Sequence, residues 1–317
     1  IRKIMASQNV SVLDRVKGVF GGGGKKSKKK GKGKGRPKTL AFEDTRDKKD
    51  EEEKPKRKGP WPAERLQILQ ELWGPEFLTV GGEEAITELI HPLTLNSNMS
   101  VLELGAGIGG GTRHIHNETG AWVSGVENSV TLAKLGMEQS IKKGLQRKAS
   151  IEHGDYSNLR VKPRSKDAVL AKEALFTVAD KDAAFNFMLG AIRPGGQLMY
   201  TDFLATGPDL NDPAVAQWQT REPRRPHLWE MERTRNKIEA AKMEVRVTED
   251  ITEKYRTRAL VGFNDLVEKV KEFREDTERV KWVILEAEIW FHRLAALDSG
   301  EVNVSRIYAR LPLGADI

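Results

Sequence analysis

The chain has 317 residues, enough for one large folded domain with extensions. It contains no cysteine, which excludes disulfide bonds, thiolate zinc sites and a cysteine nucleophile, and which fits a reducing compartment such as the cytoplasm. No apolar run approaches the roughly 18 residues that a membrane-spanning helix needs, and the formal net charge of +7 is unevenly distributed.

The first 60 residues carry the positive charge. They hold 20 basic and 8 acidic residues, whereas the remainder of the chain holds 33 and 38. Ser11–Asp14 matches a capping box, and apolar residues recur at helical spacing as far as Phe20. A polybasic run and a mixed-charge stretch follow, and neither can form a packed core. We predict a disordered basic tail with a short amphipathic helix (1–60) and a folded domain (61–317).

The tail has three interpretations. An amphipathic helix beside a polybasic run is typical of peripheral attachment to anionic lipid, so residues 11–38 are expected to contact an anionic membrane surface, at the inner face of a membrane. The tail is otherwise a solubilising segment whose helix packs on its own domain, or a nucleic-acid-binding arm. Nucleic acid is the least favoured partner, because no aromatic residues are interleaved with the lysines and the domain has no basic footprint.

A buried strand that ends in a glycine loop opens the folded domain's central motif. Residues 100–104 are predicted as the strand, Gly105–Gly111 as the loop, and a helix follows from Thr112. The glycine spacing also fits a dinucleotide fingerprint. Glu103 distinguishes a dinucleotide site from an S-adenosylmethionine site, because a carboxylate on this strand needs a cationic or hydrogen-bonding partner. A pyrophosphate would repel it, whereas the ammonium of S-adenosylmethionine would suit it.

Strands and crossover segments then alternate, which predicts a parallel sheet with ligands at the carboxyl ends of its strands. The second strand ends in Glu127, an acid suited to ribose hydroxyls, and the third is followed by Asp155 and Tyr156, which could grip an adenine. The predicted strands are 122–127, a strand with its turn over 150–156, 167–173 and 197–203. The predicted crossover helices are 129–143, 157–166 (short) and 180–192.

The last third begins with an insertion at about 204–230, rich in proline and polar residues. Its Arg221, Arg224 and Arg225 are candidates for binding a phosphate or carboxylate, or form a solvated charge cluster. The residue pattern then predicts a helix at 231–242, a strand at 244–248, helices at 259–273 and 277–297, and a last strand from Val302.

Residues 61–317 resemble the class I S-adenosylmethionine-dependent methyltransferases of the small-molecule type. The resemblance is carried by the Glu103–Gly111 loop, Glu127, the Gly154-Asp155 turn and Arg193–Gly196. It implies an α/β fold, a seven-stranded doubly wound sheet whose last strand is a reversed edge strand, with an added helical region. It also implies S-adenosylmethionine as the cosubstrate.

Within that family, Trp73–Gly82 resembles the segment that closes over the donor in the phosphoethanolamine and amine methyltransferases. Phe77 stands where they have a tyrosine, Thr79 where they have a serine, and Thr177 where they have a histidine. The residues expected to bind the donor are Phe77, Thr79, Glu103, Gly105, Ala106, Gly107, Gly109, Glu127, Asn128, Asp155 and Tyr156.

Few residues are expected to take part in the chemistry, because the cosubstrate supplies the activation and the protein supplies alignment. The methyl group should point to the carboxyl end of the fourth strand, where the chain has Lys172, Glu173 and, a few residues later, Thr177. Of these, Glu173 is the candidate to orient or deprotonate an amine. No metal site is expected, because His114 and His116 point to different faces of a helix.

The predicted function is methyl transfer to a small or lipid-like acceptor, at nitrogen in preference to carbon or oxygen. Two alternatives stay open. The missing tyrosine and histidine allow a catalytically impaired donor-binding scaffold that is recruited to a membrane, and the basic tail allows an RNA-directed methyltransferase. The sequence leaves the identity of the acceptor and the oligomeric state undecided.

Overall fold

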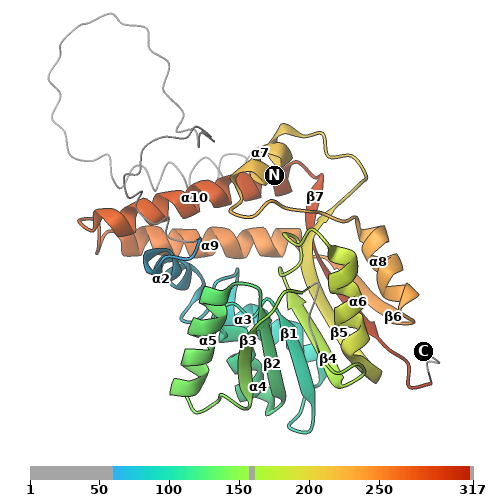
Figure 1. Ribbon diagram of the computed structural model, residues 1–317. Coiled ribbons are helices and arrows are strands. Elements are labelled where there is room, and N and C mark those ends of the chain that lie inside the picture. Colours follow the sequence, from blue (N-terminus) through green and yellow to red (C-terminus); the bar gives the residue numbers. More distant parts are fainter. Residues whose placement is uncertain (1–59, 157–160, 315–317) are drawn as a thin grey trace, which may run out of the picture.

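The structure is a computed structural model that describes residues 60–156 and 161–314 (Figure 1). Its centre is a seven-stranded sheet in the order β3-β2-β1-β4-β5-β7-β6. The first five strands run parallel, and β7 runs antiparallel to both β5 and β6. The strands are β1 (Ser100–Leu104), β2 (Trp122–Glu127), β3 (Ala149–His153), β4 (Lys166–Lys172), β5 (Ile192–Ala205), β6 (Glu244–Asp250) and β7 (Val302–Arg310).

Helices cover both faces of this sheet. One face packs against α3, α4 and α9, and the other packs against α6 and α8. Because both faces are covered, the central strands β1 and β4 are almost wholly buried and mostly apolar, with Glu103 the buried exception on β1. The helices are α2 (Ala63–Trp73), α3 (Gly82–Ile90), α4 (Gly110–Thr119), α5 (Val130–Lys142), α6 (Lys181–Ala191), α7 (Pro213–Arg221), α8 (Met231–Ala240), α9 (Thr252–Val270) and α10 (Thr277–Asp298), with a 3-10 turn η1 (His91–Leu93).

The added helical region consists of α2, α9 and α10, and α9 and α10 lie side by side beyond the sheet (Figure 1). Aromatic side chains join the three helices. The ring of Trp73 on α2 lies 5.1 Å from Trp290 on α10 and 6.2 Å from Phe263 on α9. These contacts continue into the main core, so the helical region and the sheet share one hydrophobic cluster.

The reversed last strand is confirmed, but its predicted position at the edge is wrong. β7 lies between β5 and β6, and β6 forms that edge of the sheet. The burial of the two strands explains the order: most of β7 is buried, whereas nearly all of β6 is exposed. A strand as polar as β6 is suited to pairing along one edge only.

Several predicted helices differ from the structure. The described part of the predicted helix at 157–166 is not helical: residues 161–165 form a loop and a turn, and β4 begins at Lys166. α9 begins at Thr252 instead of Ala259, and just before it the Asp250 carboxylate accepts hydrogen bonds from Thr252 N and Thr252 Oγ1.

The predicted insertion contains the helix α7, with the Asp212 carboxylate accepting from Ala214 N at its start. α2 and α3 had no counterpart in the sequence analysis. The predicted tail helix and the polybasic run lie outside the described residues. Within the described ranges, no helix is both long and apolar enough to cross a membrane.

Candidate active site

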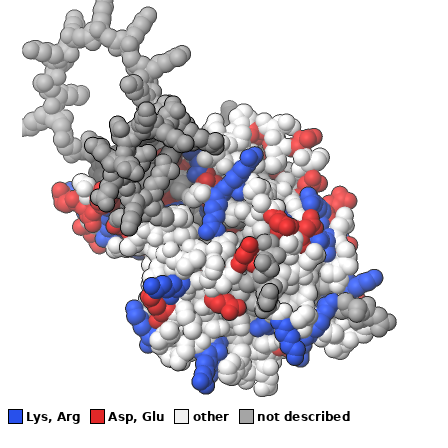
Figure 2. Space-filling view, viewed as in Figure 1, with Lys and Arg blue, Asp and Glu red and all other residues white. Residues whose placement is uncertain are grey.

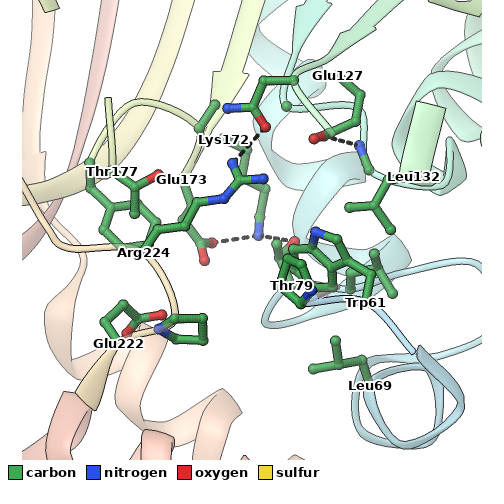
Figure 3. A pocket seen from close by; sticks show the side chains of 18 of the residues that line it. Trp61, Leu69, Thr79, Glu127, Leu132, Lys172, Glu173, Thr177, Glu222 and Arg224 are labelled. Atoms are coloured by element: carbon green, nitrogen blue, oxygen red, sulfur yellow. Dashed lines mark hydrogen bonds and ion pairs between the residues drawn. The ribbon is translucent and has the colours of Figure 1, made fainter. Parts of the chain in front are cut away.

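Two adjoining cavities open where β1, β2 and β4 end. The smaller one, the glycine-loop cavity, is lined by the loop after β1 together with Phe77 and Glu103. The larger one, the main cavity, extends from Glu127 and Tyr156 past the end of β4 to α2 and α10, and encloses about 170 Å³ (Figure 3). The residues Leu78, Thr79, Gly105, Gly107 and Lys172 line both cavities.

Close approach of the chain to itself requires glycine at several positions of the loop, of which two adjoin the cavities' key residues. Gly105 has a φ of +79°, and a Cβ there would lie 2.7 Å from the Cβ of Ala174. At Gly111, in the first turn of α4, an added Cβ would lie 2.4 Å from Glu103 Oε1. The glycines therefore bring the helix start against the Glu103 carboxylate and leave the loop backbone lining the cavity.

Glu103 is a buried carboxylate on β1, with 5% of its surface exposed. Its Oε2 accepts a hydrogen bond from Thr112 Oγ1 at 2.5 Å, and no ion pair is formed by this residue among the described residues. Burial raises the pKa of Glu103 to about 7, although the Thr112 hydrogen bond and the charges of Arg113 and Lys172 oppose the rise. The site thus holds a carboxyl group that a cationic ligand would stabilise in its charged form.

Glu127 is held at the end of β2 by backbone groups. Its Oε2 accepts from Gly107 N at 3.0 Å, and its Oε1 accepts from Ser129 N at 2.8 Å. Burial raises the pKa of Glu127, against the two backbone hydrogen bonds. The carboxylate is therefore fixed in orientation beside Asn128 and Tyr156, which line the same end of the main cavity.

An ion pair lies where the two cavities meet. The Lys172 ammonium donates to Glu173 Oε1 at 2.6 Å, to Thr79 Oγ1 at 2.8 Å and to the Val80 carbonyl at 3.1 Å (Figure 3). All three donors of the ammonium are thus used, and the segment before α3 is tied to the end of β4. Glu173 itself has a φ of +52°, a left-handed conformation that is strained for this residue and is typical of functional sites.

A buried pair of opposite charges grips the backbone of the loop that follows. Asp202 Oδ2 accepts from Leu175 N at 3.2 Å, and the Lys181 ammonium donates to the Leu175 carbonyl. Burial raises the pKa of Asp202 to about 6 and lowers the pKa of Lys181 to about 8. The backbone N–H and the carbonyl of Leu175 are therefore both held in place, and Leu175 lies between Glu173 and Thr177 in the chain.

The far end of the main cavity combines aromatic rings with paired charges. Arg293 on α10 binds Glu222 Oε1 at 2.5 Å, and its guanidinium lies 4.4 Å from the ring centroid of Trp290. Arg65 on α2 pairs with Glu286 on α10. At the opposite end of the cavity, Arg224 donates to the neutral Asn128 Oδ1 at 2.6 Å and forms no ion pair with a described residue.

Most of the predicted site residues come together. Phe77, Glu103 and Ala106 line the glycine-loop cavity, and Glu127, Asn128, Tyr156, Glu173 and Thr177 line the main one. Two do not line either cavity. Gly109 is the residue before α4 and turns the chain with a φ of +85°, and Asp155 is exposed. Of the three insertion arginines, Arg224 lines the main cavity, whereas Arg221 forms a surface pair with Glu288.

The sequence analysis missed the residues that α2, α9 and α10 bring to the site: Trp61, Arg65, Tyr255, Glu286, Trp290 and Arg293. In the chain, α2 precedes β1, and α9 and α10 connect β6 to β7, far from the glycine loop; no motif marks the positions of their site residues. The one available signal was Trp290, which the amphipathic stripe of α10 placed in the core. It lies both in the core and at the cavity wall.

Comparison with known proteins shows which proteins this chain resembles. A family model described as a methyltransferase domain matches residues 101–196. Phosphoethanolamine N-methyltransferase 3 of Arabidopsis thaliana is 26% identical over 203 residues, which cover 64% of this chain and 40% of that protein. The chain thus aligns with less than half the length of this relative.

Solved structures share the fold at lower identity. Phosphoethanolamine N-methyltransferase 2 of Haemonchus contortus, determined with phosphomonomethylethanolamine and S-adenosylhomocysteine, matches with a TM-score of 0.66 and 20% identity over 78% of this chain and 57% of that one. The [4+2]-cyclase SpnF matches with a TM-score of 0.62 and 16% identity over 79% of this chain and 93% of that one. A cyclase among the neighbours shows that the fold alone does not determine the reaction.

The sheet order, the reversed β7 and the glycine loop define the class I methyltransferase fold. The resemblance of the sequence to S-adenosylmethionine-dependent methyltransferases near the phosphoethanolamine group is confirmed by the family model, the relatives and the fold together.

Proposed function

We propose that the protein transfers a methyl group from S-adenosylmethionine to nitrogen in a small or lipid-like acceptor. The observation that carries the proposal is the junction of the two cavities at Lys172, whose ammonium is paired with Glu173. One elongated ligand fits along the glycine loop, with Glu103 at one end and Glu127 at the other. The main cavity then continues past the junction toward α10, where a second molecule has room.

The chain's own residues suit each part of the donor. The Glu103 carboxyl would accept from the amino-acid ammonium, and Glu127 would accept from the ribose hydroxyls. Asn128 and Tyr156 would face the base. The sulfonium of S-adenosylmethionine supplies an activated methyl group. The protein's task is therefore to align an acceptor nitrogen with that methyl group and to exclude water.

The wall beyond the junction suits an acceptor that carries both an amine and a polar oxygen. Glu173 lies at the junction and would orient the amine and take its proton. Trp61 Nε1, in the wall of the main cavity, is buried without a hydrogen-bond partner among the described residues. It is a donor for an oxygen of the acceptor.

Two measurements test the proposal. Calorimetry with S-adenosylhomocysteine should give saturable heat with the whole chain, and Glu127→Ala should abolish it. Labelled methyl groups should then pass from S-adenosylmethionine into an amine of a metabolite or lipid-extract panel. Heat with NADH and none with S-adenosylhomocysteine would overturn the donor assignment.

A scaffold that binds the donor without turnover is the second candidate, favoured by one observation. Phe77 and Thr177 line the cavities at the positions where the sequence resemblance expects a tyrosine and a histidine. Phe77 has no hydroxyl and Thr177 has no imidazole, so the tyrosine–histidine pair is absent. Donor binding without labelled product across the panel would favour the scaffold, and labelled product would exclude it.

A further inference from the structure

A third cavity lies behind the Lys172–Glu173 pair, on the side away from the acceptor. This rear cavity encloses about 60 Å³ between the sheet, α3 and α9. Lys172 and Glu173 line it as well as the main cavity, so the ion pair forms the wall between the two. The remaining polar lining residues are Glu88, Thr201, Glu249, Lys254, Tyr255, Arg258 and Arg306.

Thr201 points to what the rear cavity holds. This residue is 2% exposed, and its hydroxyl has no hydrogen-bond partner among the described residues. Burying a hydroxyl without a partner is unfavourable, whereas a bound water would supply the missing hydrogen bond. Thr201 lines the rear cavity, which has room for a water molecule.

Tyr255 connects this space to the site. Its hydroxyl donates to Glu173 Oε2 at 2.8 Å, and Tyr255 also lines the rear cavity. Burial raises the pKa of Tyr255 well above its ordinary value, so the hydroxyl stays protonated. A neutral hydroxyl can accept one proton while it releases another, which is what a relay requires.

The outer end of the rear cavity reaches solvent between compensated charges. Glu88 accepts from Lys254 at 2.6 Å and from Arg258 at 2.6 Å, and Arg306 pairs with Glu249. The side chain of Lys254 is 54% exposed and that of Glu249 is 45% exposed. Because each cation has a carboxylate partner, the mouth presents no unopposed positive charge to a departing proton.

We propose that the rear cavity holds the water that carries the acceptor's proton out of the active site; this rests on the proposed function. The acceptor nitrogen passes a proton to Glu173, and its lone pair forms the new bond to the methyl carbon. The bond from sulfur to that carbon breaks, and its electron pair stays on sulfur. The proton leaves Glu173 through the Tyr255 hydroxyl to the water at Thr201 and then to solvent, which restores the Glu173 carboxylate.

Charged and titratable groups face Glu173 from four elements. Lys172 on β4 and Tyr255 on α9 are hydrogen-bonded to it, and Arg293 on α10 and Asp202 on β5 act on it through their charges. Among these groups, Tyr255 is the one that contacts the Glu173 carboxylate and lines the rear cavity without carrying a charge.

Thr201→Val tests the proposal, with Thr201→Ser as its control. Valine has nearly the shape of threonine but no hydroxyl to hold the water, and serine keeps the hydroxyl. Turnover of Thr201→Val should fall about tenfold near neutral pH, with a larger solvent isotope effect, and should recover as hydroxide increases. The affinity for S-adenosylhomocysteine and the melting temperature should not fall, which separates this effect from misfolding.

Tyr255→Phe is the second variant, since it keeps the ring among its aromatic neighbours Phe203 and Trp290 and removes the hydroxyl that contacts Glu173. It should show the same changes in pH profile and isotope effect. Turnover by Thr201→Val and Tyr255→Phe equal to that of the unaltered protein at every pH would overturn the inference and leave the proposed function intact. Absence of labelled product from the unaltered protein would instead remove the proposed function itself.

Discussion

Glu103 shows how a single residue can be unfavourable for the fold and useful for the site. Its carboxyl lies on a central strand, receives one hydrogen bond and is screened from water. Burial raises its pKa to about 7, so the donor-free protein holds this group close to the midpoint of its titration at neutral pH. A bound ammonium would offset the cost of burying the charged carboxylate, because it favours the charged form.

Donor affinity should therefore depend on pH through Glu103. Binding of an ammonium lowers the pKa of Glu103 from about 7, so a proton is released and affinity rises as the pH increases toward 7, by up to about tenfold per unit. Glu103→Gln should weaken S-adenosylhomocysteine by about tenfold or more and remove the slope.

Calorimetry at several pH values, in buffers of different ionisation enthalpy, measures both quantities. Glu118→Gln, an exposed residue of α4, is the matched control and should change neither. An affinity that stays flat between about pH 5.5 and 7 would contradict the role of Glu103.

The same carboxyl should make the donor-free protein less stable as pH rises. Its pKa is about 7 when folded and near 4.5 when unfolded, so the unfolded state loses its proton first. Stability should fall by about 3 kcal/mol between these two values and then level off. Glu103→Gln should remove this fall and melt at a higher temperature above pH 7. Thermal melts of both proteins across that range give the comparison.

At the scale of elements, the loop between β4 and α6 depends on contacts from two neighbouring segments. Asp202 on β5 and Lys181 at the start of α6 hold the N–H and the carbonyl of Leu175. Both charges are buried, so their mutual compensation matters more than in a surface pair. The contacts fix the positions of Glu173 and Thr177, which bracket Leu175 in the chain.

Lys181→Met should loosen this loop without removing the donor site. Methionine fills the apolar part of the space but leaves the Leu175 carbonyl unpaired. Turnover should fall about tenfold because the groups at the junction lose their alignment, while S-adenosylhomocysteine should bind as before. Lys237→Met, which removes a surface pair with Asp182, is the control and should leave turnover unchanged. Equal turnover in both variants would show that the clamp has no part in alignment.

At the scale of the whole molecule, positive charge and the active site belong to different parts of the chain. The described surface in Figure 2 carries acidic and basic side chains interspersed, with no large patch of one sign. The excess of basic residues lies in residues 1–60, outside the described ranges apart from Pro60. Pro60 and Trp61 line the main cavity, so the tail joins the domain beside the proposed acceptor site.

The tail should accordingly recruit the protein to anionic lipid. Vesicles that contain phosphatidylserine should sediment the full chain at low salt, and raising the salt should release it because the attraction is electrostatic. A chain that begins at residue 59 should not sediment, and neutral vesicles should bind neither form. Salt-dependent RNA binding by the full chain, with no binding to vesicles, would favour the RNA-directed alternative instead.

The sequence by itself determined what depends on neighbouring residues. The alternation of strands and crossovers gave the α/β class, and the glycine loop with Glu103 and Glu127 gave the donor side, because the carboxyl ends of parallel strands meet at one edge. The tertiary structure alone decided the rest. It placed β7 inside the sheet, brought Tyr255 to Glu173, and closed the main cavity with α2 and α10. Such contacts join residues far apart in the chain through packing, which leaves no local pattern to read.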